Sequence, residues 1–435
     1  MNRQTVVENK NTLNRVAGAS FIGNFVEWFD YAAYGFLATV IAVVFFPASD
    51  PATSLMAAYA IFALSFIVRP FGGIFWGHIG DKFGRKNALS WSIILMTLST
   101  LCIALLPGYQ TIGIFAPLLL LLFRMIQGFS ASGEYAGASN FLAEYAPKEK
   151  KGLYTSLVPA STAAGLLLGS LMAAAMFAFM SEAFLHDYGW RIPFLLAAPL
   201  GLIGRYIRLK LEDTPEFLEH QKNGIKESFP IKALFTTYRT TLFKAFAVAS
   251  LNATAFYLIF SYMPNYLSTE LGMNKTKSFI SGSISLAFYI GIVFAMGKYS
   301  DHIGRKKMLL WASISFIALT LPLFYLLSSA SFIGIVLIQL IFCTLLAMND
   351  GSLPAYLTEQ FPVHVRYTVF AFSFNTANAL LGGTIPLTAT WLIHHTGSTL
   401  APAAILIVVS LFTISALLYT QSHRLVSATV QGTTV

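Results

Sequence analysis

Four ionisable side chains lie inside stretches of the chain that are otherwise apolar, and their types suit proton transfer and anion binding. Glu27 and Asp30 are three residues apart, so a helix would place both on one face. Arg124 and Glu134 lie together in a later apolar stretch. A buried carboxyl group can hold a proton near neutral pH, and a guanidinium group fits a carboxylate in two parallel hydrogen bonds. We therefore predict proton coupling at Glu27, Asp30 and Glu134, and a carboxylate clamp at Arg124.

The same residues have a plainer interpretation, in which they only hold helices together. Glu27 or Asp30 could form a permanent ion pair with Arg124, which would fix the first apolar helix to the fourth. Arg124 and Glu134 are ten residues apart, roughly 15 Å along a helix, which is too far for direct contact. Glu134 would then transfer protons or bridge to a neighbouring helix.

Aromatic and polar side chains in the apolar stretches could complete a substrate site. Aromatic rings attract quaternary ammonium groups, although rings are also common wherever helices pack in a membrane. Asp350 lies in the tenth apolar stretch, where it could pair with a substrate cation, act as a second proton site or hydrogen-bond a neighbouring helix. The predicted substrate contacts are Arg124, Gln127, Tyr31, Tyr34, Tyr135, Tyr257, Asp350 and Asn375.

The elements that must position these residues are membrane-spanning helices. Of the 435 residues, 56% are hydrophobic and 11% are charged, whereas soluble domains carry about a quarter charged residues. A helix needs about 20 apolar residues to cross the bilayer core. Twelve such stretches occur, near residues 17–46, 54–78, 88–106, 112–142, 153–181, 190–210, 239–268, 277–299, 308–327, 331–357, 366–394 and 399–420. The sequence therefore predicts an all-α membrane protein.

Two phrases occur twice, which indicates an internal duplication. GHIGDKFGRK begins at Gly77 and GKYSDHIGRK begins at Gly297, 220 residues later. Glu144, Pro147 and Lys151 are spaced like Glu359, Pro362 and Arg366, 215 residues later. Repeated helical bundles with polar residues inside them are typical of secondary transporters. We predict a first bundle over residues 1–210, a linker over 211–238, and a second bundle over 239–435 that ends in a short tail.

Basic residues gather in alternate loops between the apolar stretches. The net charge is +9, which alone could indicate nucleic acid binding. The basic residues, however, do not form one face of a soluble domain, and their alternation follows the positive-inside rule. This pattern predicts that the repeated phrases and both termini are cytoplasmic. The basic residues assigned to these loops are Lys82, Arg85, Lys86, Lys148, Lys150, Lys151, Arg205, Arg208, Lys210, Arg305, Lys306 and Lys307.

The repeated phrases resemble the loop signature of the major facilitator superfamily, which lies between helices 2 and 3 and between helices 8 and 9. The segments Asn24–Phe36, Arg69–Gly73, Arg124–Ala138, Ala143–Gly152 and Tyr188–Phe194 are similar to its metabolite:proton symporter family. LEDTPEF (Leu211–Phe217) and YMPNYLS (Tyr262–Ser268) are similar to the proline/betaine branch. The resemblance implies twelve helices in two pseudo-symmetric six-helix bundles, and import of a small organic solute with a proton.

The resemblance also implies an inner gate built on the repeated loops. Asp81 can meet the positive N-terminus of a partner helix or a nearby arginine. Arg85 and Lys86, with Arg305 and Lys306, can bridge to acids on the same face. The alternative is that the basic loops only anchor the protein at the membrane surface. The predicted gating residues are Asp81, Arg85, Lys86, Glu144, Asp301, Arg305, Lys306 and Glu359.

The leading function is import of a proline- or betaine-type zwitterion with a proton by alternating access. A symporter of a di- or tricarboxylate, such as oxoglutarate or citrate, is the alternative within the fold. A solute sensor without transport is the alternative of another class. The sequence has no phosphate loop, nucleophile elbow or metal-type cluster, so we expect neither an ATP-driven pump nor an enzyme, and no cofactor. The expected partners are a small solute, protons and membrane lipid, without nucleic acid. The expected protein is a monomer of the bacterial inner membrane.

Overall fold

The computed structural model describes residues 3–47, 51–222 and 231–419, and these residues form helices without a β-strand. The tail predicted after Tyr419 and residues 223–230 of the predicted linker lie outside the described residues. Large apolar side chains face outward from the bundle: Phe71 is 66% exposed and Leu387 is 74% exposed. Exposure of this kind is expected where lipid, not water, surrounds a protein.

The helices fall into a first half, a linker and a second half. In the first half, the elements are α1 (Arg3–Phe36), α2 (Ala38–Phe45), α3 (Pro51–Ile67), α4 (Arg69–Phe83), α5 (Arg85–Leu105), α6 (Tyr109–Ile112), α7 (Phe115–Ala131), α8 (Glu134–Tyr145), η1 (Lys148–Lys150), α9 (Lys151–Thr155), α10 (Leu157–Phe179), α11 (Glu182–Asp187), η2 (Gly189–Arg191) and α12 (Ile192–Leu209). The linker elements are α13 (Pro215–Lys222) and α14 (Ile231–Thr236). In the second half, the elements are α15 (Arg239–Phe256), η3 (Tyr257–Tyr262), α16 (Met263–Thr269), α17 (Lys275–Ile303), α18 (Arg305–Leu327), α19 (Phe332–Asp350), α20 (Leu353–Glu359), α21 (Arg366–Ala377), η4 (Asn378–Gly382), α22 (Ile385–Thr396) and α23 (Ala401–Leu418).

Ten helices of the described residues are long and apolar enough to cross a membrane, and the bent pair α1 and α2 makes an eleventh span. The remaining predicted span, 366–394, is divided into α21, η4 and α22. It loosens to a π-helix at Asn378–Gly382, just before Pro386, whose ring nitrogen cannot donate to the carbonyl of Gly382. With this interrupted span the architecture corresponds to the predicted twelve helices in two bundles.

The duplicated phrases have the same backbone conformation. Gly84 precedes α5 with φ +103°, and Gly304 precedes α18 with φ +96°. Only glycine adopts this conformation without strain, so each Gly-Arg-Lys phrase marks a sharp turn between two long helices. We call the end of the molecule that carries both turns the GRK face.

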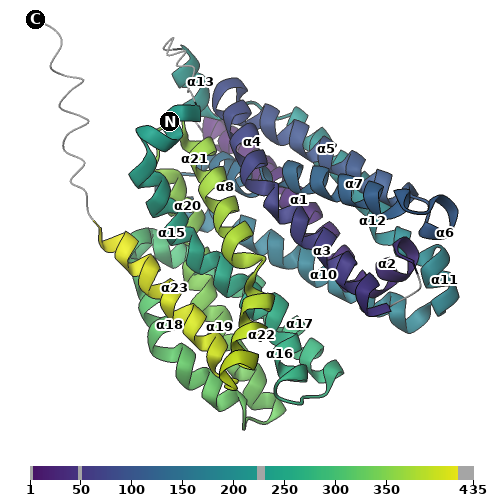
Figure 1. Cartoon of the computed structure of the whole chain (residues 1–435). Coiled ribbons are helices and arrows are strands. Elements are labelled where there is room, and N and C mark those ends of the chain that lie inside the picture. Colours follow the sequence, from purple (N-terminus) through teal and green to yellow (C-terminus); the bar gives the residue numbers. More distant parts are fainter. Residues whose placement is uncertain (1–2, 48–50, 223–230, 420–435) are drawn as a thin grey trace, which may run out of the picture.

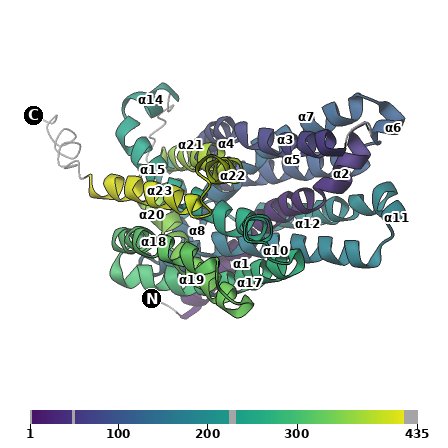
Figure 2. The same cartoon turned by 60° about the horizontal axis from the view of Figure 1, so that its bottom comes forward.

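The two halves meet at the GRK face and diverge toward the opposite end (Figure 1). Helices α2, α6 and α11 gather at the far end of the first half in both views (Figures 1 and 2). The buried apolar cluster at that end, around Trp190, contains residues of the first half alone. The clusters at the centre and toward the GRK face combine residues of both halves. The structure is therefore closed at the GRK face.

Close approach of the halves depends on small residues. A Cβ atom added to Gly297 of α17 would lie 2.6 Å from the carbonyl oxygen of Gly152 in α9. One added to Gly73 of α4 would lie 3.0 Å from the backbone of Ala371 in α21. These pairs of helices thus cross with their backbones almost in contact, as small residues in membrane helices permit.

Candidate functional site

A pocket lies where the two halves meet at the middle of the molecule. Its walls bound about 240 Å³ of space that protein atoms do not occupy, a volume that includes the open side of the pocket, and in this closed state the enclosed part has room for about one water molecule. Six helices supply its walls, three from each half. The nine lining residues are Trp28, Tyr135, Pro159, Thr162, Asn252, Phe256, Asp350, Phe374 and Asn378. Four of these nine are aromatic and one is acidic, and none is basic, so the lining suits a cation better than an anion.

Asp350 is the charged group of this pocket, and its hydrogen-bond partners are neutral. The amide of Asn252 and the hydroxyl of Tyr289 both donate to its carboxylate. Asp350 is fully buried at the end of α19. Because a buried carboxylate without a cationic partner is costly, the site favours either a proton or a ligand cation at Asp350.

Two polar groups on the pocket wall lack protein partners. The indole N–H of Trp28 and the hydroxyl of Tyr135 are buried and make no hydrogen bond within the described part of the chain. Trp28 packs edge-on against Phe256 with ring centroids 5.4 Å apart, and Tyr135 stacks on Phe374 at 4.1 Å. Each of these pairs joins the first half to the second. The rings thus form an aromatic cage that carries unused hydrogen-bonding groups.

Asp30 and Arg124 form a buried ion pair inside the first half. An Nη1–Oδ2 distance of 3.1 Å joins them. Arg124 also donates to Gln127, which in turn donates to Thr100, and its guanidinium lies 4.2 Å from the ring centre of Tyr34. Arg124 does not line the pocket. The pair ties α1 to α7, which is the structural alternative that the sequence left open.

Glu27 pairs with an arginine that sequence reasoning did not select. Arg69, near the start of α4, donates to Oε1 of Glu27 at 2.9 Å. Its guanidinium lies 4.6 Å from the ring centre of Tyr31 and 4.7 Å from that of Phe66. Arg69 follows Val68, at the break between α3 and α4, so the sequence places it at a point where an apolar helix is interrupted.

Glu134 bridges to α12 through a second unexpected arginine. Arg208 approaches its carboxylate with both terminal nitrogens, at 2.7 and 2.9 Å, and Ser92 donates to the same carboxylate at 2.7 Å. Placing Arg208 with the loop residues was wrong, because its side chain is 2% exposed. The chain reaches the end of α12 one residue later, so the long side chain can turn back into the bundle.

The other predicted substrate residues do not line the pocket. Tyr257 packs against Trp28, with ring centroids 6.3 Å apart, and its hydroxyl has no partner among the described residues. Tyr34 donates to the carbonyl of Ala58 at 2.9 Å, so it joins α1 to α3. Asn375 donates to the carbonyl of Ser132 at 2.8 Å, across the two halves.

Two repeated acids cap partner helices at the GRK face. Asp81 accepts hydrogen bonds from the backbone N–H groups of Tyr367 and Thr368, at 3.1 and 2.9 Å, at the start of α21. Asp301 accepts from those of Gly152 and Leu153, at 2.8 and 3.0 Å, at the start of α9. Each acid belongs to one half and caps a helix of the other. A carboxylate at a helix N-terminus is favourable because of the unpaired N–H groups and the helix dipole.

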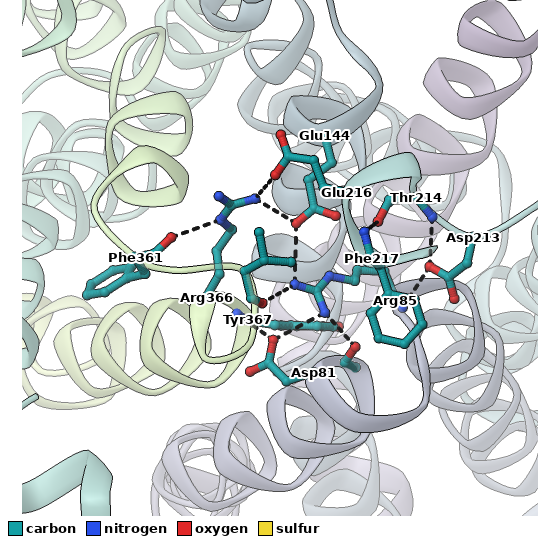
Figure 3. Close-up of polar contacts among 12 residues, drawn as sticks. Asp81, Arg85, Glu144, Asp213, Thr214, Glu216, Phe217, Phe361, Arg366 and Tyr367 are labelled. Carbon is teal, nitrogen blue, oxygen red and sulfur yellow. Dashed lines mark hydrogen bonds and ion pairs between the residues drawn. The ribbon is translucent and has the colours of Figure 1, made fainter. Parts of the chain in front are cut away.

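Arg85 and Arg366 join the cap of Asp81 to a wider network that includes the linker (Figure 3). Arg85 is fully buried, lies 3.3 Å from both Asp81 and Glu144, and donates to the carbonyl of Val363 at 2.6 Å. Arg366 reaches Glu144 at 2.9 Å and Glu216 of α13 at 2.6 Å. The linker therefore takes part in closing the GRK face.

The second copy of the gate has the corresponding bridge. Arg305 lies 3.1 Å from Glu359 and donates to Asp301 at 2.8 Å. Both predicted arginine–glutamate bridges are thus present. Among the ion pairs of the described residues, none uses the side chain of Lys86 or Lys306.

Asp213 of the linker lies outside the membrane-spanning segments and is held by backbone donors. The N–H groups of Arg85, Lys86 and Thr214 donate to its Oδ1 at 3.0, 3.4 and 2.9 Å. Burial raises the pKa of its carboxyl above the usual value, although these hydrogen bonds and the charge of Arg85 act in the opposite direction.

Comparisons with known proteins agree with this geometry. The family model described as Major Facilitator Superfamily matches residues 20–386. The proline/betaine transporter of Escherichia coli (strain K12) is 38% identical over 423 residues, which cover 94% of this chain and 83% of that protein. The glycine betaine/proline/ectoine/pipecolic acid transporter OusA of Dickeya dadantii is 37% identical, over 93% of this chain and 82% of its own length. The solved structure of the proton:xylose symporter XylE with 6-bromo-6-deoxy-D-glucose has a TM-score of 0.77 at 16% identity, over 94% of this chain and 95% of that chain.

Proposed function

The chain belongs to the major facilitator superfamily, and we propose that it imports a small zwitterion of the proline/betaine type together with a proton. The names of its relatives support the substrate class. The observation that carries the proposal is the lining of the central pocket, in which aromatic rings surround a carboxylate. A quaternary or secondary ammonium group gains from the ring faces and from Asp350, and both gains are larger in a site that excludes water.

The same lining argues against a di- or tricarboxylate substrate. Two or three carboxylates need basic partners, and none of the nine residues that line the pocket is basic. A sensor without transport is disfavoured because each half contributes an equivalent cap to the other at the GRK face. The symmetric caps at Asp81 and Asp301 have a role in a carrier that opens and closes, and no evident role in a static receptor.

The way the halves meet supports alternating access. The present state is closed at the GRK face by the two caps and by the arginine bridges to Glu144 and Glu359. Breaking these contacts would let the first half, residues 1–210, rock against the second, residues 239–435, about the linker. The eight predicted gating residues act here, with Lys86 and Lys306 adding positive charge at the same face.

The orientation follows from the positive-inside rule. The GRK face carries the basic loops, so we place it and both termini on the cytoplasmic side of a bacterial inner membrane. In the present state the pocket is then closed toward the cytoplasm. The proton is carried by a buried acid of the first half, and Glu27, Asp30 and Glu134 are the candidates.

Transport in proteoliposomes tests the proposal. Uptake of labelled proline, betaine, oxoglutarate and citrate is measured with an imposed inward proton gradient, with and without an uncoupler. We expect accumulation of proline and betaine that the uncoupler abolishes, and little uptake of the two carboxylates. Preference for oxoglutarate or citrate would remove the substrate assignment, and uptake indifferent to the uncoupler would remove proton coupling.

A further inference from the structure

The three buried acids of the first half differ in what surrounds their arginine partners. Glu134 and Arg208 are held by Ser92 and by the carbonyls of Leu89 and Ala19, all within the first half. Asp30 and Arg124 are likewise enclosed by first-half residues. The pair of Glu27 and Arg69 borders the second half beside the central pocket, whereas the second-half residue near Glu134 and Arg208 is Tyr367, which does not line the pocket.

Contact with the second half runs through three aromatic rings. The Arg69 guanidinium lies 5.9 Å from the ring centre of Trp28 and 4.7 Å from that of Phe66. Both rings pack on Tyr257 of η3, with centroids 6.3 and 5.8 Å away. Trp28 also forms a wall of the central pocket. One indole ring therefore separates Arg69 from the space in which the substrate binds.

Each member of the Glu27–Arg69 pair has a polar atom without a hydrogen-bond partner in the described part of the chain. Arg69 and Glu27 share a single contact, and neither Nε of Arg69 nor Oε2 of Glu27 has a hydrogen-bond partner within the described residues. A guanidinium group is able to bind a carboxylate through two nitrogens at once. Arg69 is thus a buried cation whose Nε–H group is unpaired among these residues. It lies behind the wall of a pocket whose lining has no basic residue to bind the carboxylate of a zwitterion.

We propose that Arg69 binds the substrate carboxylate, and that Glu27 releases Arg69 to the substrate when Glu27 takes up a proton. This inference rests on the proposed function and names the coupling acid within it. A carboxylate of the substrate and the carboxylate of Glu27 compete for one guanidinium. Protonation of Glu27 removes the competitor, so proton and substrate bind together, which is the condition for symport.

The electrostatic surroundings of Glu27 are compatible with this exchange. The acids near it, Asp30 and Glu134, are each neutralised by an arginine of their own. The helix packed along its other side, α10, presents the hydroxyls of Ser161 and Thr162, which accept from Asn24. The charged and titratable groups around Glu27 are Arg69 from α4, Asp30 from α1, Glu134 from α8 and Tyr257 from η3. Arg124 and Arg208 are the partners of Asp30 and Glu134. Because Arg69 is the arginine in contact with Glu27, while Arg124 and Arg208 are each paired with another acid, Arg69 is the cation that responds to the protonation of Glu27.

The test compares betaine with choline, which has the same quaternary ammonium group but no carboxylate. Affinity for each is measured by competition in counterflow exchange from pH 5.5 to 8.5 without a gradient. For the wild type, betaine affinity should weaken about tenfold per pH unit once Glu27 loses its proton, because one proton is linked to binding. Choline affinity should not follow pH in this way. In Glu27→Gln, betaine affinity should stay high and should no longer weaken toward high pH, and gradient-driven accumulation should be lost while exchange persists.

Asp30→Asn and Arg69→Lys complete the experiment. Asp30→Asn should keep the pH dependence of betaine affinity, whatever the transport rate of this variant. Arg69→Lys should weaken betaine binding at least about tenfold through loss of the two-point contact, and should leave choline affinity unaffected.

The inference is overturned if Asp30→Asn, and not Glu27→Gln, removes the pH dependence of betaine affinity, or if Arg69→Lys leaves betaine affinity unchanged. A wild type that exchanges neither betaine nor proline would instead refute the proposed function itself. Gel filtration in detergent confirms that each variant is folded.

Discussion

At the scale of single residues, groups of opposite charge lie at the pocket and behind its wall. Asp350 offers a carboxylate with neutral partners, and the aromatic cage lies beside it. Arg69 lies behind the cage with its own acid. A zwitterion matches this order of charges, because its ammonium group can meet Asp350 while its carboxylate points toward Arg69. An inorganic cation would leave Arg69 without a partner from the substrate, and a dicarboxylate would leave Asp350 without one.

Replacing Asp350 by Asn tests whether this carboxylate binds the ammonium group of the substrate. The change keeps the size of the side chain but removes the counter-charge, so betaine affinity should fall between about tenfold and a hundredfold, the range of one well-placed charge interaction. Competition binding measures the loss. The control is Asp187→Asn, which removes the same charge from an exposed position in α11. Equal affinity in the Asp350 variant would show that the carboxylate does not hold the substrate.

A second residue-level prediction concerns Glu134. Glu134→Gln leaves the buried Arg208 without its counter-ion, which should destabilise the protein by about 3 kcal/mol or more. The double variant Glu134→Gln and Arg208→Gln should recover part of this loss, because no uncompensated buried charge remains. Thermal unfolding in detergent measures both. If the single and double variants unfold at the temperature of the wild type, the pair does not stabilise the fold.

The sequence identified the buried acids and one of their partners, Arg124, which pairs with Asp30, whereas the arginine partners of Glu27 and Glu134 could not be predicted. Glu27, Asp30, Glu134 and Asp350 are conspicuous as charges inside apolar stretches. Their partners are set by helix packing between distant segments: Glu27 and Arg69 are 42 residues apart, and Glu134 and Arg208 are 74 apart. Spacing along one helix carries no information about such pairs, so Arg208 was placed among the loop residues.

At the scale of elements, each half is locked by a helix cap that the other half supplies. Asp81 caps α21 and Asp301 caps α9, so both interfaces use the same device. The expectation that Asp81 meets the N-terminus of a partner helix came from its place beside a helix end. The identity of that helix required the structure, because it depends on how the halves are docked.

Weakening one cap should open the GRK face. Asp81→Asn removes the charge that favours the α21 N-terminus and should cost about 1 to 2 kcal/mol, which changes the balance of open and closed states about five- to thirtyfold. Spin labels at Asn87 and Lys307, in a background with Cys102 and Cys343 replaced by Ser, report the separation of the halves. The distance distribution should shift toward longer values in Asp81→Asn. An unchanged distribution would mean that the cap does not hold this face shut.

Breaks within helices were the least predictable elements. The span predicted at 366–394 is interrupted by η4, and a second π-helix, η3, interrupts the span that begins with α15. Pro264 and Pro386 follow these π-helices and are visible in the sequence. A proline alone does not determine whether a helix kinks, widens or ends, because neighbouring helices decide which backbone groups find new partners.

At the scale of the whole molecule, the duplication explains why the closed GRK face carries two copies of the same set of contacts. The offset between the repeated phrases gave the two bundles before any contact was known. Whether the bundles are open or closed at the GRK face depends on small free-energy differences between the contacts of the two states. A sequence repeat does not contain that information. Here the halves are joined at the GRK face, where glycine backbones touch and the linker helix α13 adds Glu216 to the arginine network.

Glycine contact between the halves should be required for transport. Gly297→Ala places a Cβ atom 2.6 Å from the carbonyl oxygen of Gly152, so it should prevent full closure of the GRK face and greatly reduce betaine uptake. Gly291 lies on the same helix, and a Cβ atom added there meets nothing within 4 Å. Gly291→Ala is therefore the matched control and should transport like the wild type. Equal uptake by both variants would contradict the role assigned to this contact.

Proton movement caused by substrate alone tests the central claim most directly. Betaine is added to proteoliposomes that hold a trapped pH-sensitive dye, with no gradient imposed and with membrane potential clamped. Coupled entry of proton and zwitterion predicts that the lumen becomes more acidic, that choline has no such effect, and that Glu27→Gln abolishes the response. Betaine entry that leaves the internal pH unchanged, or makes it more alkaline, would contradict the account.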